Sequence, residues 1–131
     1  MSLKTYTLNN QICAHSKNAA HAVELPPNSR LLFCNGQVGA RLDGSVPAVP
    51  LQQICIIFER LDTILEAASM TLDDIVRLTV YVTDKSIFEQ FFQVREEVMR
   101  DHNPPAILLA VGEFPRTGVT VESEAIAAKP A

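Results

Sequence analysis

The sequence lacks features that would place the chain in a membrane or outside the cell. Its longest apolar runs, such as residues 54–58, are far shorter than the roughly 20 residues of a membrane-spanning helix. No apolar stretch follows Lys4, so we expect no secretory signal peptide. The chain has an odd number of cysteines, Cys13, Cys34 and Cys55, and no Cys-x-x-Cys motif. Both facts argue against a disulfide framework. We therefore expect free thiols and a cytoplasmic protein that does not contact membranes.

Clusters of basic residues are also absent. The 11 Lys and Arg residues are outnumbered by 15 Asp and Glu residues, the net charge is −4, and no two basic residues are adjacent. Binding to a phosphate backbone requires clustered cations that displace counterions, so nucleic acid is not an expected partner. The histidines are far apart and lack ligand spacing such as His-x-x-x-His, so we expect no metal site.

What the sequence does contain is an ordinary globular composition. Of its 131 residues, 47% are apolar and 20% are charged, which is close to average usage. A chain of this length buries about two thirds of the surface that it exposes when unfolded. We therefore expect residues 1–131 to form a single domain around one core.

Two stretches of the chain have clear but different apolar periods. Residues 51–68 repeat their apolar side chains at steps of three and four, which predicts an amphipathic helix that covers a sheet. Residues 75–83 alternate instead, which predicts a strand. Its expected core face carries Val76, Leu78, Val80 and Val82, and its other face carries Arg77, Thr79, Tyr81 and Thr83. The second face is polar and bulky, as expected for a surface that meets solvent, a ligand or a partner.

The remaining apolar runs predict further strands and a second helix. The strands are expected over residues 3–8, 21–25, 30–34, 106–111 and 119–127. Ser86 and Glu89 have the spacing of a capping box, so the second helix should begin there and run to about residue 101. Its expected inner stripe is Ile87, Phe91, Val94 and Val98. This order of elements predicts a sheet with both helices on one face.

The predicted sheet has more apolar residues than two helices can cover. Leu31, Phe33, Leu108 and their neighbours cannot all point at the helices. Exposed apolar surface of this kind favours burial against another subunit. We therefore expect the chain to form an oligomer with itself.

Several motifs occur in an order that resembles a known family. Residues 33–38, Phe-Cys-Asn-Gly-Gln-Val, resemble an F-x-S-G-Q-I/V motif, and residues 65–68 with 71–84 are similar to a helix-to-strand passage. Phe88, Pro105-Ala106 and residues 121–127 complete the match, which spans about residues 20 to 128. Together these segments resemble the RidA/YjgF family, also known as L-PSP.

The resemblance implies a fold, an assembly and a chemistry. The fold would be chorismate-mutase-like α+β, a mixed six-stranded sheet with two helices on one face. Three copies would surround a central barrel, with small-molecule pockets between neighbouring subunits. Typical members hydrolyse enamines and imines, such as 2-aminoacrylate, to keto acids and ammonia, and the resemblance implies no cofactor.

The resemblance also assigns residues to the pocket, with departures that bear on its chemistry. The family motif P-A/T-R-S has an arginine that clamps the substrate carboxylate, but Ile107 stands in that position here. Asn35 replaces the serine of S-G-Q, and Ala19 replaces a tyrosine. Gly36, Phe88 and Glu122 match, and Glu122 is where members position the attacking water. The expected substrate-binding residues are Asn35, Gly36, Phe88, Ile107 and Leu109, with Arg116, or else Arg41, supplying the missing cation.

Two functions remain open from the sequence. In the first, the chain would be a divergent hydrolase or deaminase that uses Glu122 to activate a water. Its substrate would be a small imine, enamine or related metabolite that is less anionic than an imino acid. Alternatively, it would be a non-catalytic, metabolite-binding or regulatory trimer in which Ile107 and Leu109 fill the pocket. Glu122 and Glu124 share one strand face and are either site residues or exposed charges. Ribonuclease activity is disfavoured by the acidic balance.

Overall fold

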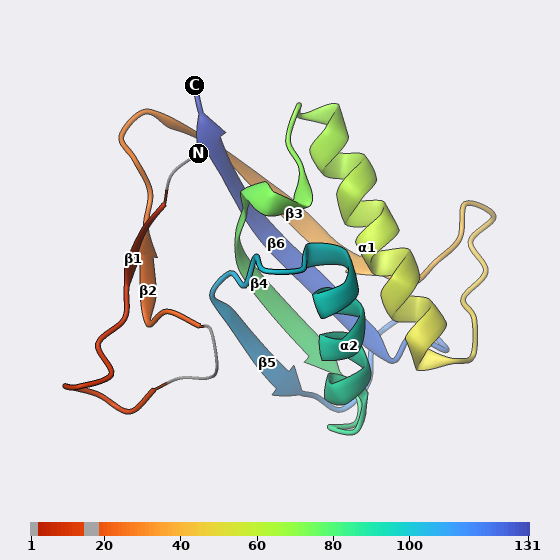
Figure 1. The fold of residues 1–131 in the computed structure, drawn as a ribbon. Helices are drawn as coiled ribbons and strands as arrows, with labels where there is room; N and C mark the ends of the chain where they lie inside the picture. The colour runs from red at the N-terminus through yellow and green to blue at the C-terminus, as the bar shows by residue number, and fades with distance from the viewer. Residues whose placement is uncertain (1–2, 15–18) are drawn as a thin grey trace.

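A computed structural model describes residues 3–14 and 19–131 of the chain (Figure 1). In chain order, the elements are β1 (Lys4–Tyr6), β2 (Ala22–Glu24), β3 (Ser29–Val38), α1 (Pro50–Ala67), the 3₁₀ turn η1 (Leu72–Asp74), β4 (Ile75–Val82), α2 (Ile87–Met99), β5 (Ala106–Ala110) and β6 (Val121–Pro130). The bounds of α1 and β4 lie within one residue of those predicted from the apolar periods.

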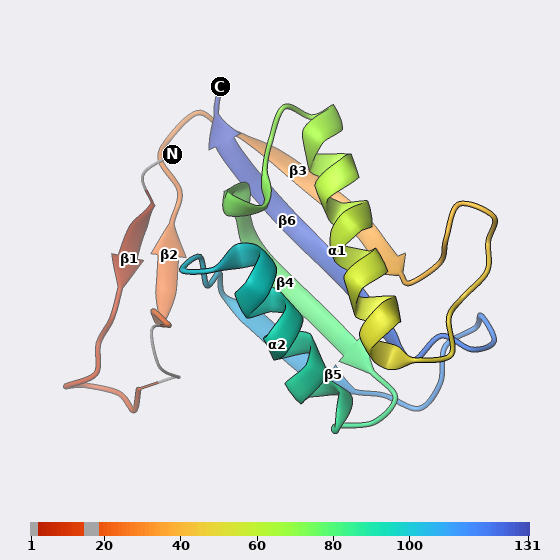
Figure 2. The same cartoon turned by 45° about the vertical axis from the view of Figure 1, so that its right-hand side comes forward.

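The main sheet is mixed and has the strand order β3-β6-β4-β5. β6 runs antiparallel to both β3 and β4, whereas β4 and β5 are parallel. Parallel neighbours require a crossover connection, and α2 supplies it. Both helices pack on the same face, α1 over β3 and β6 and α2 over β4 and β5 (Figures 1 and 2). The predicted α+β class with two helices on one face is confirmed.

The six strands found among the described residues form two sheets, which corrects the expectation of one six-stranded sheet. β1 and β2 pair with each other in a two-stranded sheet beside the main one (Figure 2). After β2 the chain passes through Pro26 and Pro27, which have no N–H to donate to a ladder. Asn28 then adopts a φ of 63°, in the left-handed region. This turn ends β2 before β3 begins, so β2 pairs with β1 rather than with the main sheet.

The core lies between the helices and the inner face of the sheet. The inner residues of β4, Leu78, Val80 and Val82, are fully buried, as their alternation predicts. The rings of Phe58 on α1 and Phe91 on α2 have centroids 5.3 Å apart, which joins the two helices. The inner stripe of α2 departs from prediction at one position. Met99, the last residue of α2, is buried, whereas Val98 is 40% exposed.

A buried glutamine fixes the start of α1 against two loops. The side-chain amide of Gln53 donates to the carbonyl oxygens of Pro47 and Gly118 at 2.8 and 2.9 Å. Its Oε1 accepts from the backbone N–H of Thr120 at 3.0 Å. Gly39 passes so close that a Cβ added there would lie 2.4 Å from the Cα of Gln53. These contacts set where β3 ends and where β6 begins, and both strands carry residues of the candidate site.

The capping box predicted for α2 does not form. Ser86 makes no side-chain cap hydrogen bond; instead, its backbone N–H donates to Oδ1 of Asp84 at 2.8 Å. Asp84 lies closer to the free N–H groups because the chain turns through Asp84-Lys85-Ser86 before the helix begins. The hydrogen bonds from Ser86 lower the pKa of the Asp84 carboxyl.

We expect Asp84→Ala to destabilise α2 in a pH-dependent manner, and Ser86→Ala to do so by less, because Ser86→Ala keeps the backbone hydrogen bond to the Asp84 carboxylate. The folded-state pKa of Asp84 is depressed, so its contribution is present above the unfolded pKa and is lost as the pH falls. The thermal midpoint of Asp84→Ala should fall by a few degrees at pH 7, and the difference from the parent should shrink below about pH 4. Thermal unfolding at several pH values measures both, with Ser86→Ala as the matched control. An equal loss in the two variants would contradict this assignment of the cap.

Candidate functional site

The face of the sheet that points away from the helices carries most of the predicted site residues. On β6, Val121, Ser123 and Ala125 are buried under the helices, so Glu122 and Glu124 point to the opposite side. The register places Tyr81 opposite Glu122 and Thr79 opposite Glu124 on β4, and Ile107 and Leu109 beside Thr79 and Tyr81 on β5. The structure therefore brings Glu122, Ile107 and Leu109 to one surface, which we call the open face.

A bulge in β3 brings Gly36 and Glu122 together. Cys34 pairs with Ala125 and Gln37 pairs with Ser123, so Asn35 and Gly36 together lie opposite Glu124 alone. A Cβ added to Gly36 would lie 2.5 Å from Oε2 of Glu122. The carboxyl group of Glu122 thus rests directly over the glycine, in space that every other residue type would occupy.

Tyr81 joins this cluster of carboxylates as a proton donor. Its hydroxyl donates to Oε1 of Glu124 at 3.3 Å. Desolvation raises the pKa of Tyr81, and the negative charges of Glu124 and Glu122 raise it further. The phenol therefore stays protonated at neutral pH. The open face holds two acceptor carboxylates and one hydroxyl donor across two adjacent strands.

The other predicted residues lie apart from Glu122 within one chain. Phe88 is half-buried in the helix layer, where it packs against the core on the other side of the sheet. Arg116 is exposed in the β5–β6 loop and donates to the carbonyl oxygen of Gly44. Arg41 lies in the β3–α1 loop, where its guanidinium is 3.4 Å from Oγ of Ser45. Neither arginine is brought to Ile107 by these contacts.

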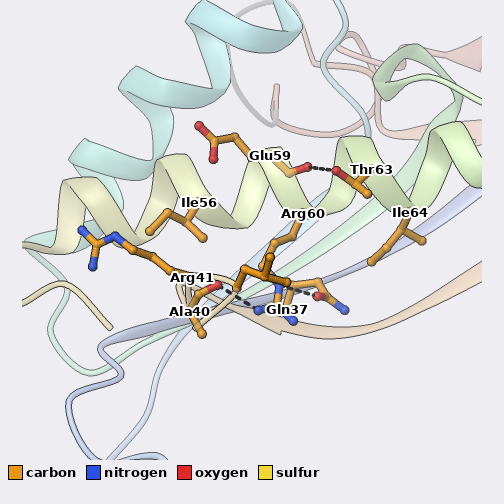
Figure 3. A pocket seen from close by; sticks show the side chains of 9 residues that line it. Gln37, Ala40, Arg41, Ile56, Glu59, Arg60, Thr63 and Ile64 are labelled. Atoms are coloured by element: carbon orange, nitrogen blue, oxygen red, sulfur yellow. Dashed lines mark hydrogen bonds between the residues drawn. The ribbon is translucent and has the colours of Figure 1, made fainter. Parts of the chain in front are cut away.

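One cavity near these loops is lined by a structural arginine. It measures about 550 Å³ and lies between α1 and the end of β3, with Arg41 at its rim (Figure 3). Arg60 donates to Oε1 of Gln37 and to the carbonyl oxygen of Ala40, both at 3.0 Å. These bonds hold the end of β3 to α1. The cavity lies on the helix side of the sheet, apart from the carboxylates of the open face.

Two smaller cavities meet at a residue that the sequence did not single out as a site residue. One, of about 240 Å³, lies on the open face and is lined by Phe33, Cys34, Asn35, Arg77, Thr79, Glu124, Ala125 and Ile126. The other, of about 270 Å³, is lined by Ala19, Ala20, His21, Arg77, Phe92, Asn103, Pro104, Pro105, Ala106 and Leu108. Arg77 is common to both. The signal for it was its place on the polar, bulky face of β4.

Cys34 borders the open-face cavity from a buried strand position. Burial raises the pKa of its thiol, so the unreactive protonated form is favoured. Cys34 is thus a buried residue of the strand predicted over residues 30–34, with a free thiol.

The open face is also apolar beyond the carboxylates. Leu31 and Phe33 on β3 are 54% and 69% exposed, and Ile107 and Leu109 on β5 are each 41% exposed. Leu108 was expected among the uncovered residues, but it packs against the core. Neighbouring residues of a strand face opposite sides, so Ile107 and Leu109 take its place on the open face.

Comparison with known proteins identifies the family. A family model described as Endoribonuclease L-PSP matches residues 12–129. The chain belongs to the YjgF/L-PSP family. A member from Schizosaccharomyces pombe, named Protein mmf2, mitochondrial, is 30% identical over 101 residues, which are 76% of this chain and 80% of that protein. The Escherichia coli member TdcF is 29% identical over 105 residues, 77% of this chain and 81% of its own, and is named provisionally as a reactive intermediate deaminase.

The fold of the YjgF/L-PSP family extends over nearly the whole chain. The crystal structure of the Rid family protein YyfB from Yersinia pestis superposes with a TM-score of 0.84 at 21% identity, covering 98% of this chain and all of that one. The match confirms the family fold that the ordered motifs predict. Among the helices that the structure describes, none is long and apolar enough to cross a membrane.

Proposed function

We propose that three copies of the chain assemble through their open faces and form small-molecule pockets in which Glu122 activates a water. The carboxyl group of Glu122 over Gly36 is the observation that carries this proposal. The bulge holds the carboxylate beside bare backbone, where a small ligand can approach without meeting a side chain. The exposed apolar residues beside it supply the surface that subunits would bury.

The reaction that suits this arrangement is hydrolysis of a carbon–nitrogen double bond. The water oxygen would bond to the imine carbon while the carboxylate of Glu122 takes a proton from the water. The carbon–nitrogen π electrons move to nitrogen, which then receives the proton from Glu122. The hydroxyl of the resulting carbinolamine then gives its proton to the carboxylate of Glu122, which passes it to the amino nitrogen, so that the carbon–nitrogen bond breaks as the carbonyl forms and ammonia leaves. Deaminase chemistry of this kind is also what the name of TdcF describes.

Ile107 argues against 2-imino acids as substrates of this chain. An isoleucine offers no charge and no hydrogen bond to a carboxylate on the reacting carbon. The substrate would be an imine, an enamine or a related small metabolite held in another way. We place this activity in the cytoplasm, on the ground that Cys13, Cys34 and Cys55 are free thiols.

A second function is favoured by the same two apolar residues. Ile107 and Leu109 flank the carboxylates on the open face. If they fill the pocket in the trimer, the chain would bind or regulate without chemistry. The turnover experiment separates the two functions.

We expect no appreciable hydrolysis of 2-iminopropionate, but accelerated hydrolysis of at least one imine whose carboxylate is absent or distant. Imines generated in place by an amine or amino acid oxidase, with carbonyl product followed by a coupled assay at neutral pH, measure this. Glu122→Gln should lower turnover by about 100-fold or more, because a general base contributes roughly 10²–10⁴-fold. Glu124→Gln is the matched control and should retain more activity. Release of pyruvate above background would contradict the specificity, and full activity in Glu122→Gln would contradict the mechanism.

We expect light scattering to give three times the mass of one chain. Phe33→Glu should dissociate the assembly, because it would bury an unpaired charge in the subunit interface. Leu42→Glu is the matched control, since Leu42 is fully exposed in the β3–α1 loop. A monomeric parent protein, or a Phe33→Glu variant that stays trimeric, would contradict assembly through the open face.

A further inference from the structure

We infer that Arg77 binds a carboxylate of the ligand, and that the ligand carries this group at the end of a spacer rather than on the reacting carbon. The inference rests on the proposed role of Glu122. It names the substrate class of the same site: small imines, and the corresponding ketones, with a distant carboxylate.

The guanidinium of Arg77 has no partner that would withdraw it from a ligand. Among residues 3–14 and 19–131, no carboxylate forms an ion pair with it and no hydrogen bond engages it. It borders both small cavities, and no other Lys or Arg lines either of them in the described part of the chain. A guanidinium offers two parallel N–H donors that match the two oxygens of a carboxylate. Arg77 is therefore the cation that the open face presents.

The register fixes how far this cation lies from the reacting group. Tyr81 pairs with Glu122, and Arg77 is two alternate positions before Tyr81 on the same face of β4. Alternate strand residues are about 6–7 Å apart, so the backbone of Arg77 is about 13 Å from the level of Glu122. Ile107 pairs with Thr79 and is only one such step away. An anion held by Arg77 thus lies farther from Glu122 than one held at position 107.

The open-face cavity occupies the Arg77 end of this distance. It is lined by Arg77, Glu124 and Asn35, and Asn35 is the chain neighbour of Gly36, over which Glu122 rests. Phe33 and Ile126 supply apolar walls, which suit a hydrocarbon spacer. A 2-imino acid is too short to reach both ends, because its carboxylate is bonded to the reacting carbon.

Glu124 orients the ligand within the cavity. Its carboxylate lines the cavity between Arg77 and Glu122, at the level of Thr79. A ligand carboxylate is repelled from this middle position and attracted to the Arg77 end.

Titration of the assembled protein with a series of keto acids tests the inference. Pyruvate, levulinate and 6-oxoheptanoate present the same ketone with increasing distance to the carboxylate, and calorimetry or NMR shifts give their dissociation constants. We expect levulinate and 6-oxoheptanoate to bind about 10-fold or more tightly than pyruvate. Arg77→Gln should weaken both by about 10- to 100-fold, whereas Arg77→Lys should restore part of the affinity. The methyl ester of 6-oxoheptanoate should bind the parent and Arg77→Gln equally.

Arg116→Gln is the matched control, because Arg116 is the cation that the sequence favoured. It should leave all three affinities unchanged. Tightest binding of pyruvate, or equal affinities in Arg77→Gln and the parent, would overturn the inference. So would loss of the trimer in Arg77→Gln by light scattering, since Arg77 would then serve the subunit interface. Arg77-dependent binding without turnover of any imine would sink only the hydrolase proposal, and turnover with Arg77-independent binding would sink only this inference.

Discussion

Replacing Gly39 with alanine is expected to destabilise the protein by about 3 kcal/mol or more, at the upper end of overpacking effects. The new methyl group would lie 2.4 Å from the Cα and 2.7 Å from the carbonyl oxygen of Gln53. Both are backbone atoms of α1, so no side-chain rotation relieves the clash. The start of the helix must move, and the four hydrogen bonds of the Gln53 amide must lengthen with it.

Thermal and urea unfolding of Gly39→Ala measure this loss. A loss of this size corresponds to a drop in the thermal midpoint of roughly 10 °C for a chain of this length. Gly112→Ala is the matched control, because a Cβ at Gly112 would meet no atom within 4 Å. It should change the free energy of unfolding by less than about 0.5 kcal/mol. Equal stability in the two variants would show that α1 does not pack against Gly39 as described.

Replacing Gly36 with alanine is expected to lower turnover by about 100-fold, with little change in stability. The added methyl group would lie 2.5 Å from Oε2 and 3.0 Å from Cδ of Glu122. Both atoms are at the far end of a flexible side chain, so the carboxyl group swings away and the fold is kept. A misplacement of about 1 Å in a catalytic group costs on the order of 10²-fold in rate.

A double-mutant cycle separates this effect from general damage to the site. Residues that act as a unit are not additive, so Gly36→Ala should cost almost nothing further in the Glu122→Gln background. The rates are measured on the imine that the parent protein turns over fastest. Full activity in Gly36→Ala, or the same 100-fold loss in the Glu122→Gln background, would show that Gly36 does not position Glu122.

Local sequence was sufficient where the side-chain period is strong. The helix at residues 50–67 and the strand at 75–82 follow directly from steps of three and four and from strict alternation. The same alternation predicted that Arg77, Thr79 and Tyr81 share a polar face, and the register of β4 with β6 places the carboxylates of Glu124 and Glu122 opposite Thr79 and Tyr81. The capping of α2 was not predictable in this way, because Ser86 and Asp84 both carry suitable oxygens. The path of the chain decides between them.

The cation of the site shows the limit of reasoning from motifs. Aligning Pro105-Ala106-Ile107 with a motif shows which side chain is missing, but not which other one can reach the space. The loop positions of Arg116 and Arg41 predict that one of them supplies the cation, but hydrogen bonds tie both of them to those loops. Arg77 was assigned no role, because its closeness to Ile107 arises from the pairing of β4 with β5. That pairing joins strands separated by a whole helix.

The sequence by itself determined the class of this protein: one α+β chain with two amphipathic helices, no basic cluster and the ordered motifs of the YjgF/L-PSP family. These properties depend on composition and on periods within single elements, which are local. Only the tertiary structure decided that β1 and β2 leave the main sheet, that Glu122 rests over Gly36, and that Arg77 faces the cavity beside them. The first depends on the turn at Pro26, Pro27 and Asn28. The other two depend on strand register, and the contact of Glu122 with Gly36 also on a bulge, because a shift of one residue would turn every side chain to the other face.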